Sequence, residues 1–259
     1  TNTYYTEVNS PITLIKDNEN SKSIKVPDAI NLKCIVCGNQ GQPKEIGSAR
    51  SNVRRIRNQI FSLWRCARCE SLHCETVSNY AELYQDYPIR KQRLDYFLNI
   101  WYDVILKRLI SVGLRTENTI LDYGCGTGLF LEFLNRKGYT NSNGYDPHVK
   151  DFNSTDVLTK RYDFVVSFDV VEHDLDPKAF VKRLIELLNP NGQLCIETPN
   201  AEGIELLNVE DHIHALHLPY HVHLITPSAL KNLCLSAGLQ TRVIYKKWRH
   251  ISKKHKYNT

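Results

Sequence analysis

This sequence of 259 residues lacks several features that mark particular classes of protein. It contains no methionine, an unusual absence at this length that no pattern in the sequence explains. No apolar run approaches the roughly 20 residues that a helix needs to cross a bilayer, and no secretory signal sequence is visible. Internal repeats and low-complexity stretches are also missing. These absences argue against a membrane-spanning, fibrous or repeat protein.

What is present suits one α/β domain with a small additional module, because 42% of the residues are hydrophobic and 24% are charged. The net charge is only +5, and residues 242–259 carry seven Lys or Arg and no acid. A basic tail over residues 249–259 can bind nucleic acid or an anionic membrane, but we favour a solvated, frayed chain end. Residues 1–30 are mostly polar, and we expect a poorly ordered start.

The eight cysteines do not resemble a secreted disulfide set. Four of them form two C-x-x-C pairs that 28 residues separate, namely Cys34, Cys37, Cys66 and Cys69. Each pair forms a turn that directs two thiolates to one point, and two such turns make a tetrahedral sulfur site that suits Zn²⁺. We predict a zinc ribbon over residues 31–78 with hairpin strands between the pairs, in a cytoplasmic protein. Disulfides or unrelated thiols are the alternatives, and His73 and Cys74 are not expected as ligands.

A glycine-rich turn stands at the centre of the chain, in Asp122-Tyr-Gly-Cys-Gly-Thr-Gly128. The apolar pair Ile120-Leu121 precedes it, and an apolar pattern of helical period follows over residues 129–134. This order predicts a buried strand, a tight turn and a helix. Glycines let the backbone turn sharply and leave no Cβ in the way of a ligand. A glycine turn without a ligand is the alternative, and the spacing differs from the G-x-G-x-x-G of dinucleotide binders.

The turn resembles the first motif of class I S-adenosylmethionine-dependent methyltransferases. In that family the turn holds the methionine part of the cofactor, and an acidic residue about twenty positions on binds the ribose hydroxyls. Asp146 stands twenty positions after Gly126. The resemblance implies a doubly wound, mostly parallel α/β sheet over residues 79–248. It also implies that S-adenosylmethionine is bound by Asp122, Gly124, Gly126, Gly128 and Asp146, with Asp156 at the adenine amino group.

The apolar patterns predict the other elements of this fold. We expect helices at residues 89–112, 178–188 and 229–237, and strands at 157–158, 162–168, 193–198 and 239–245.

Glu172 and His173 follow the strand predicted at 162–168, as such a pair does in the ubiquinone-methyltransferase branch of the family. That position is the carboxyl end of the sheet, where ligands bind in open α/β folds. The pair can act as a general base, hold a divalent metal or cap the next helix, and we favour a functional role. A histidine that titrates near pH 6.5 would take a proton at neutral pH.

Five histidines then lie within twelve residues, namely His212, His214, His217, His221 and His223. Pro219 makes a shared helix face for His217 and His221 improbable. We therefore expect a loop over the active site that supplies one or two polar groups, rather than one metal cluster.

Two features bear on the substrate. The cysteine module and the stretch Tyr220-His-Val-His223 resemble those of sugar C-methyltransferases that act on nucleotide-linked deoxysugars. Those enzymes carry a further carboxy-terminal domain that has no counterpart in these 259 residues. A similar ribbon also precedes an rRNA methyltransferase domain, but no Asn-Pro-Pro-Tyr pattern of nucleic-acid amino methylases follows the strand at 162–168.

The leading hypothesis is methyl transfer to an oxygen or carbon of a small polar metabolite, such as a sugar or a nucleotide-linked sugar intermediate. The alternatives are an rRNA methyltransferase, a quinone or phenol O-methyltransferase, and a binding module that no longer catalyses.

Overall fold

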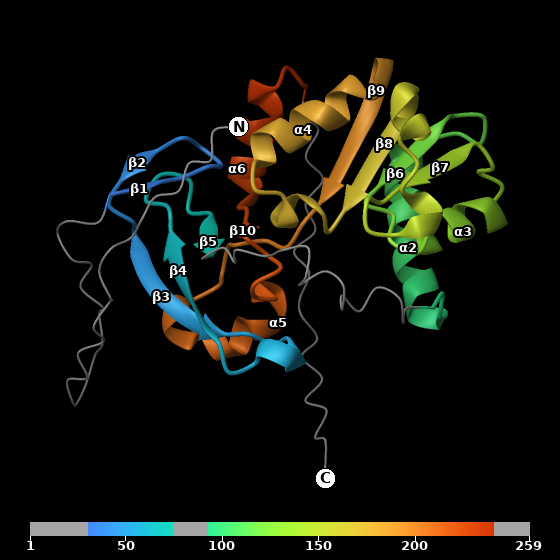
Figure 1. Cartoon of the computed structure of the whole chain (residues 1–259). Helices are drawn as coiled ribbons and strands as arrows, with labels where there is room; N and C mark the ends of the chain where they lie inside the picture. The colour runs from blue at the N-terminus through green and yellow to red at the C-terminus, as the bar shows by residue number, and fades with distance from the viewer. Residues whose placement is uncertain (1–30, 75–92, 241–259) are drawn as a thin grey trace, which may run out of the picture.

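The computed structural model describes residues 31–74 and 93–240, whose strands form three sheets (Figure 1). The expected disordered start, the basic tail and positions 241–245 of the strand expected at 239–245 lie outside the described residues. The ribbon strands lie on one side of the molecule and the parallel sheet on the other, with β10 between them (Figure 1).

The cysteine pairs sit in a small antiparallel unit. The first pair lies between β1 (Leu32–Lys33) and β2 (Gln40–Gly41), which pair with each other. The expected hairpin is present: β3 (Glu45–Arg50) pairs with β4 (Ile60–Arg65), with the 3₁₀ helix η1 (Arg54–Ile56) between them. The second pair leads into β5 (Leu72–Cys74), which pairs with β4. The fourth strand of this sheet is β10 (His223–Leu224), which comes from the far end of the chain.

The second four-stranded sheet is parallel, in the order β7-β6-β8-β9. Its strands are β6 (Ile120–Tyr123), β7 (Ser142–Tyr145), β8 (Tyr162–Phe168) and β9 (Leu188–Glu197). Successive side chains of a strand point to opposite faces. Accordingly Ile120 packs in the cluster of α2 (Tyr96–Ser111) and α3 (Leu129–Arg136), whereas Leu121 packs with α4 (Pro177–Glu186) and α6 (Pro227–Ser236). Helices on both faces confirm the predicted doubly wound α/β sheet.

Side-chain caps set where the helices begin. Asp95 accepts from the backbone N–H of Leu98, so α2 starts at Tyr96 rather than at 89, and residues 89–92 lie outside the described residues. Asp176 and Thr226 cap α4 and α6 in the same way, each followed by a proline at the first helical position. Within the described ranges the longest helix, α2, has 16 residues, and no helix is long and apolar enough to cross a membrane.

One expected strand is wrong. Residues 157–158 belong to the 3₁₀ helix η4 (Thr155–Thr159), which follows another short helix, η3 (Lys150–Phe152). Ser154 Oγ accepts from the Asp156 N–H, and Thr159 Oγ1 donates to the Asp156 carbonyl. Such local side-chain bonds compete with sheet pairing, and a helical turn still lets Val157 and Leu158 pack against the core.

The histidine-rich stretch is also more regular than the expected loop. It begins in η6 (Leu206–His212), continues in the short helix α5 (Ile213–Leu216), and then leads to β10.

Candidate active site and cysteine cluster

The glycine turn joins the carboxyl end of β6 to α3. Gly124, Gly126 and Gly128 all have positive φ, at 86°, 53° and 78°. A Cβ on Gly124 would lie 2.3 Å from the Val170 side chain, and one on Gly128 would lie 2.5 Å from the Phe152 ring. Both the backbone conformation and the space therefore require glycine at these two positions.

Two carboxyl groups stand beside the turn. Asp146 follows β7, where its Oδ2 accepts from the Gly126 N–H at 3.0 Å and its Oδ1 accepts from the His148 N–H at 2.8 Å. Asp122 lies within β6 and is buried, and burial together with the charge of Asp146 raises its pKa to about 7. The structure thus brings the two acids that the motif predicts to one place, although one lies in β6 and the other follows β7.

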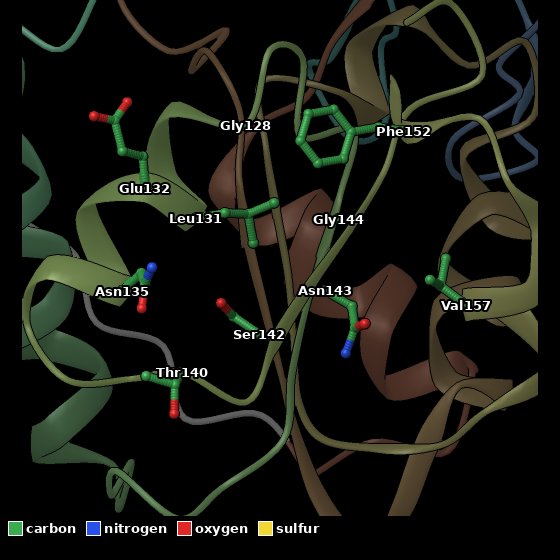
Figure 2. Close-up of a pocket in the computed structure, with 10 residues that line it drawn as sticks. All are labelled: Gly128, Leu131, Glu132, Asn135, Thr140, Ser142, Asn143, Gly144, Phe152 and Val157. Carbon is green, nitrogen blue, oxygen red and sulfur yellow. The ribbon is translucent and has the colours of Figure 1, made fainter. Parts of the chain in front are cut away.

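A hollow of about 480 Å³ adjoins the turn (Figure 2). It lies at the edge of the sheet, next to η4. Figure 2 shows the Phe152 ring beside Gly128. Asp156, the residue expected near adenine, is exposed on η4 and accepts from Ser154 Oγ at 3.0 Å. The ten lining residues are Gly128, Leu131, Glu132, Asn135, Thr140, Ser142, Asn143, Gly144, Phe152 and Val157.

Glu172 is in the 3₁₀ helix η5 (Val171–His173), which follows β8 after a short turn. Its side chain is completely buried. Oε2 accepts from Thr198 Oγ1 at 2.9 Å, whereas Oε1 has no hydrogen-bond partner. Burial, with the charge of Asp169 adding to it, raises the pKa of Glu172 well above its usual value. The alternative of a helix cap is wrong for this pair, because Asp176 caps α4.

Two histidines lie beside Glu172: His221 faces its carboxyl group, and His173 packs against His221. His173 Nδ1 lies 2.9 Å from the Tyr220 carbonyl oxygen, and its ring packs edge-on against His221 with centroids 4.8 Å apart. His221 Nδ1 donates to the Ala215 carbonyl at 2.8 Å, and its Nε2 lies 3.9 Å from Glu172 Oε1. Burial lowers the pKa of His173 to about 4 and that of His221 to about 3. The expectation that His173 titrates near 6.5 is therefore wrong.

We call Glu172, His173 and His221 the rim cluster, because one ligand atom from each lies within 4.8 Å of the others. Among the five histidines of the stretch, only His221 joins it. His217 stacks on Tyr220, His223 contacts His73, and His214 is exposed. The five histidines thus divide among several different contacts. The sequence signals for His221 were the density of histidines and the stretch Tyr220-His-Val-His223, and neither singled out this residue.

The four cysteines of the two pairs also converge. Their sulfur atoms lie within 4.8 Å of one another, with Cys34 Sγ 3.6 Å from Cys69 Sγ and Cys37 Sγ 3.7 Å from Cys66 Sγ. All four are thiols rather than disulfides. His73 Nε2 lies 3.2 Å from Cys34 Sγ, and its ring stacks on Trp64. Four sulfur donors in this arrangement suit a tetrahedral metal site.

A family model for a methyltransferase domain matches residues 93–243, more than half of the chain. The chain belongs to the class I S-adenosylmethionine-dependent methyltransferases. A ubiquinone biosynthesis O-methyltransferase of Bradyrhizobium diazoefficiens is 31% identical over 156 residues, which are 49% of this chain and 61% of that protein. The mitochondrial ubiquinone biosynthesis O-methyltransferase of Bos taurus is 29% identical over 159 residues, 48% of this chain and 42% of that protein. The chain thus spans less than two thirds of the length of either relative.

A solved structure, magnesium protoporphyrin IX methyltransferase from Synechocystis PCC 6803 with bound SAH, is similar over 62% of this chain and 84% of that chain. Its TM-score is 0.43 and its sequence identity is 16%.

The residues of this methyltransferase fit the cofactor of its family. Three of the five residues between the strand and the helix are glycines without a Cβ, and the Asp146 carboxylate hydrogen-bonds to the turn at Gly126. The family match begins after the cysteine ribbon, but it includes β10. The matched region therefore contributes a strand to the sheet that carries the second cysteine pair.

Proposed function

We propose that this methyltransferase moves the methyl group of S-adenosylmethionine to a hydroxyl oxygen of a small phenol or quinol, with the rim cluster at the acceptor. The O-methyltransferase names of the relatives support oxygen over carbon, and a quinone-related ring over the sugar that the cysteine ribbon suggested.

The observation that carries the proposal is the pair of atoms Glu172 Oε1 and His221 Nε2, which face each other at 3.9 Å. The proton of His221 is on Nδ1, because that atom donates to the Ala215 carbonyl. When Glu172 is ionised, the lone pair of Nε2 therefore faces a carboxylate oxygen that has no partner. Two buried acceptors without a donor between them are unfavourable. A hydroxyl group of the acceptor supplies that donor.

The reaction follows from this placement. When bound, the cofactor supplies an electrophilic methyl group on its sulfonium. As the bond between oxygen and methyl forms and the bond between sulfur and methyl breaks, the ionised form of Glu172 takes the hydroxyl proton. Because its pKa is raised, Glu172 ionises only at a pH above the ordinary range, and the ionised form is then a stronger base than an ordinary carboxylate. A phenol, with a pKa of about 10, is also easier to deprotonate than an alcohol. Thr198 holds the other carboxyl oxygen, and the Tyr220 carbonyl orients His173.

A second role for the rim cluster is divalent-cation binding. One carboxyl oxygen and two imidazole nitrogens within 4.8 Å form a ligand set that transition metals and Zn²⁺ accept. Such a cation would hold the acceptor oxygen and lower the pKa of its hydroxyl.

We also propose that Cys34, Cys37, Cys66 and Cys69 hold a structural Zn²⁺. The convergence of four sulfurs without a disulfide supports this assignment. A site with four thiolates has no open position, so this metal takes no part in the chemistry.

The test is transfer of a labelled methyl group to three acceptors in parallel: 3,4-dihydroxybenzoate, a nucleotide-linked deoxysugar and rRNA. We expect an O-methylated product from the catechol. Label only in the sugar or only in rRNA would overturn the proposal, and cofactor binding without any transfer would favour a non-catalytic module. Activity that disappears with chelator and returns with a transition-metal ion such as Co²⁺, while zinc stays bound to the cysteines, would assign the cation role to the rim cluster.

A further inference from the structure

One short stretch of chain contacts both the cysteine cluster and the rim cluster. We call residues 220–226, which include β10, the bridging segment. On one side the Tyr220 carbonyl contacts His173, and the Val222 N–H donates to the Glu172 carbonyl at 2.9 Å. On the other side the Val222 carbonyl accepts from the Cys74 N–H at 3.0 Å. A single residue, Val222, thus hydrogen-bonds to both parts of the molecule.

The cysteine turns hold the rest of the bridging segment. Thr226 Oγ1 donates to the Cys69 carbonyl at 2.8 Å, and the Thr226 N–H donates to Ser71 Oγ at 3.3 Å. His223 pairs with His73 in the sheet, and their Nδ1 atoms lie 3.0 Å apart. Each of these ribbon residues lies within five positions of a cysteine of the second pair. The position of the segment therefore depends on the fold of the second cysteine turn.

A side-chain path also connects Cys34 to the segment. His73 Nε2 lies 3.2 Å from Cys34 Sγ, and with a metal on the thiolate this nitrogen would be the donor. His73 Nδ1 lies 3.0 Å from His223 Nδ1, where it would then accept. Stacking on Trp64 fixes the His73 ring, with centroids 4.2 Å apart. The path thus runs from the sulfur cluster to a residue two positions from His221.

We propose that the cysteine ribbon forms one wall of the acceptor site, with His73 and His223 as positioning residues that hold the bridging segment and so place His221 opposite Glu172. This inference rests on the proposed function only in taking the rim cluster as the acceptor site. The ribbon then supports the acceptor side of the reaction, because its contacts reach the rim cluster through residues 220–226.

The experiment compares three substitutions of His73 by hydrogen exchange in the zinc-loaded chain with S-adenosylmethionine absent. His73→Phe keeps a ring against Trp64 and removes both hydrogen bonds. In His73→Gln the side-chain amide can still donate a hydrogen bond to Cys34 Sγ. In His73→Asn the side-chain amide can still hydrogen-bond to His223. The control is His214→Asn, which changes an exposed histidine of the same stretch.

We expect His73→Phe to exchange the Val222 and Cys74 amides about tenfold faster, the factor that loss of one buried hydrogen bond gives. Exchange over the glycine turn and the affinity for S-adenosylmethionine should stay unchanged, as should zinc content. His73→Asn should restore part of the protection. Unchanged protection at Val222 in His73→Phe would overturn the proposal. An equal rise over residues 120–128 would also overturn it, because it would mean a general loss of stability.

A kinetic measurement separates this inference from the proposed function. With 3,4-dihydroxybenzoate as acceptor, His73→Phe should lower kcat or raise the KM for the acceptor while the KM for S-adenosylmethionine is unchanged. If the parent chain transfers no methyl group to this acceptor, the proposed function fails, and hydrogen exchange still decides whether the ribbon positions the segment.

Discussion

The glycine turn and the rim cluster follow neighbouring parallel strands, β6 and β8, yet they are built in different ways. The turn consists of a few consecutive residues, and its conformation is set by positive φ angles and by backbone hydrogen bonds to the end of β7. The rim cluster gathers residues 172, 173 and 221, and Thr198 also binds its carboxylate. Its geometry therefore depends on tertiary packing, including the sheet of the cysteine ribbon.

The two sites also differ in how their polar groups are satisfied. Both oxygens of the Asp146 carboxylate accept backbone N–H bonds, one from Gly126 in the turn and one from His148. In the rim cluster, Glu172 Oε1 is buried without a partner. A satisfied site is preformed for its ligand, whereas an unsatisfied buried carboxyl group lowers stability until a proton, a cation or a substrate hydroxyl reaches it. The comparison predicts that the cofactor side tolerates damage to the ribbon and that the acceptor side does not.

The largest effect should come from removing the metal ligands of the ribbon. Structural Zn²⁺ supplies on the order of 10 kcal/mol to folding in small zinc domains, and this ribbon has a small core of its own. We expect one Zn²⁺ per chain in the parent protein and its loss in the Cys66→Ser/Cys69→Ser double variant, as measured by elemental analysis. Methyl transfer should fall with the metal, whereas binding of S-adenosylmethionine should persist.

Cys234→Ser is the control, because this cysteine lies outside the cluster, on α6. Less than half an equivalent of zinc in the parent, or full retention in the double variant, would contradict the assignment.

The sequence predicted sites built from local patterns better than it predicted the rim cluster, which gathers residues that are distant in the chain. The C-x-x-C spacing and the glycine turn are local patterns, and both predicted the residues that converge in the structure. The sequence placed Glu172 and His173 correctly at the end of a buried strand, but it could not indicate that burial lowers the pKa of His173 to about 4. It also could not select His221 over His223 within the stretch Tyr220-His-Val-His223, because β10 pairs with a strand about 150 residues earlier.

The misassigned strand has a related cause. Val157 and Leu158 are apolar enough for a strand, but bonds from Ser154 and Thr159 to the backbone of Asp156 favour a helical turn. Short apolar runs do not distinguish the two conformations.

The next largest effect should be on turnover at the rim cluster. Glu172→Gln keeps the shape of the side chain and removes the proton acceptor, which typically costs roughly 10²–10⁴ in rate. The cofactor affinity should be kept, and Glu202→Gln, an exposed change, should be neutral. His173→Asn should also lower turnover without lowering the melting temperature. If turnover survives and the melting temperature falls, His173 is structural and not catalytic.

The pH dependence of stability tests the same carboxyl group. The folded pKa of Glu172 lies above the usual 4.5, so the folded chain holds a proton that the unfolded chain has lost. Stability should therefore fall as pH rises from about 4.5 through the raised pKa. The Glu172→Gln variant has no carboxyl group at this position, so its stability does not fall in this way. Its melting temperature relative to that of the parent should therefore rise between pH 5 and pH 8. If the relative melting temperature of the variant falls instead, a cation holds Glu172 ionised in the parent.

The smallest effect should be on cofactor binding at Asp146. A charge-assisted hydrogen bond is worth ~1.5–3 kcal/mol, so Asp146→Ala should weaken S-adenosylmethionine binding by roughly ten- to hundredfold in calorimetry. Part of that loss comes from the turn, because the substitution also removes the acceptor of the Gly126 N–H. Asp146→Asn separates the two contributions: it can keep an acceptor for that N–H while it removes the charge. Asp156→Ala is the comparison on the exposed helix η4, where a weaker bond to adenine should cost less than about tenfold. Unchanged affinity in Asp146→Ala would remove this residue from the cofactor site and leave its carboxylate as a support of the turn alone.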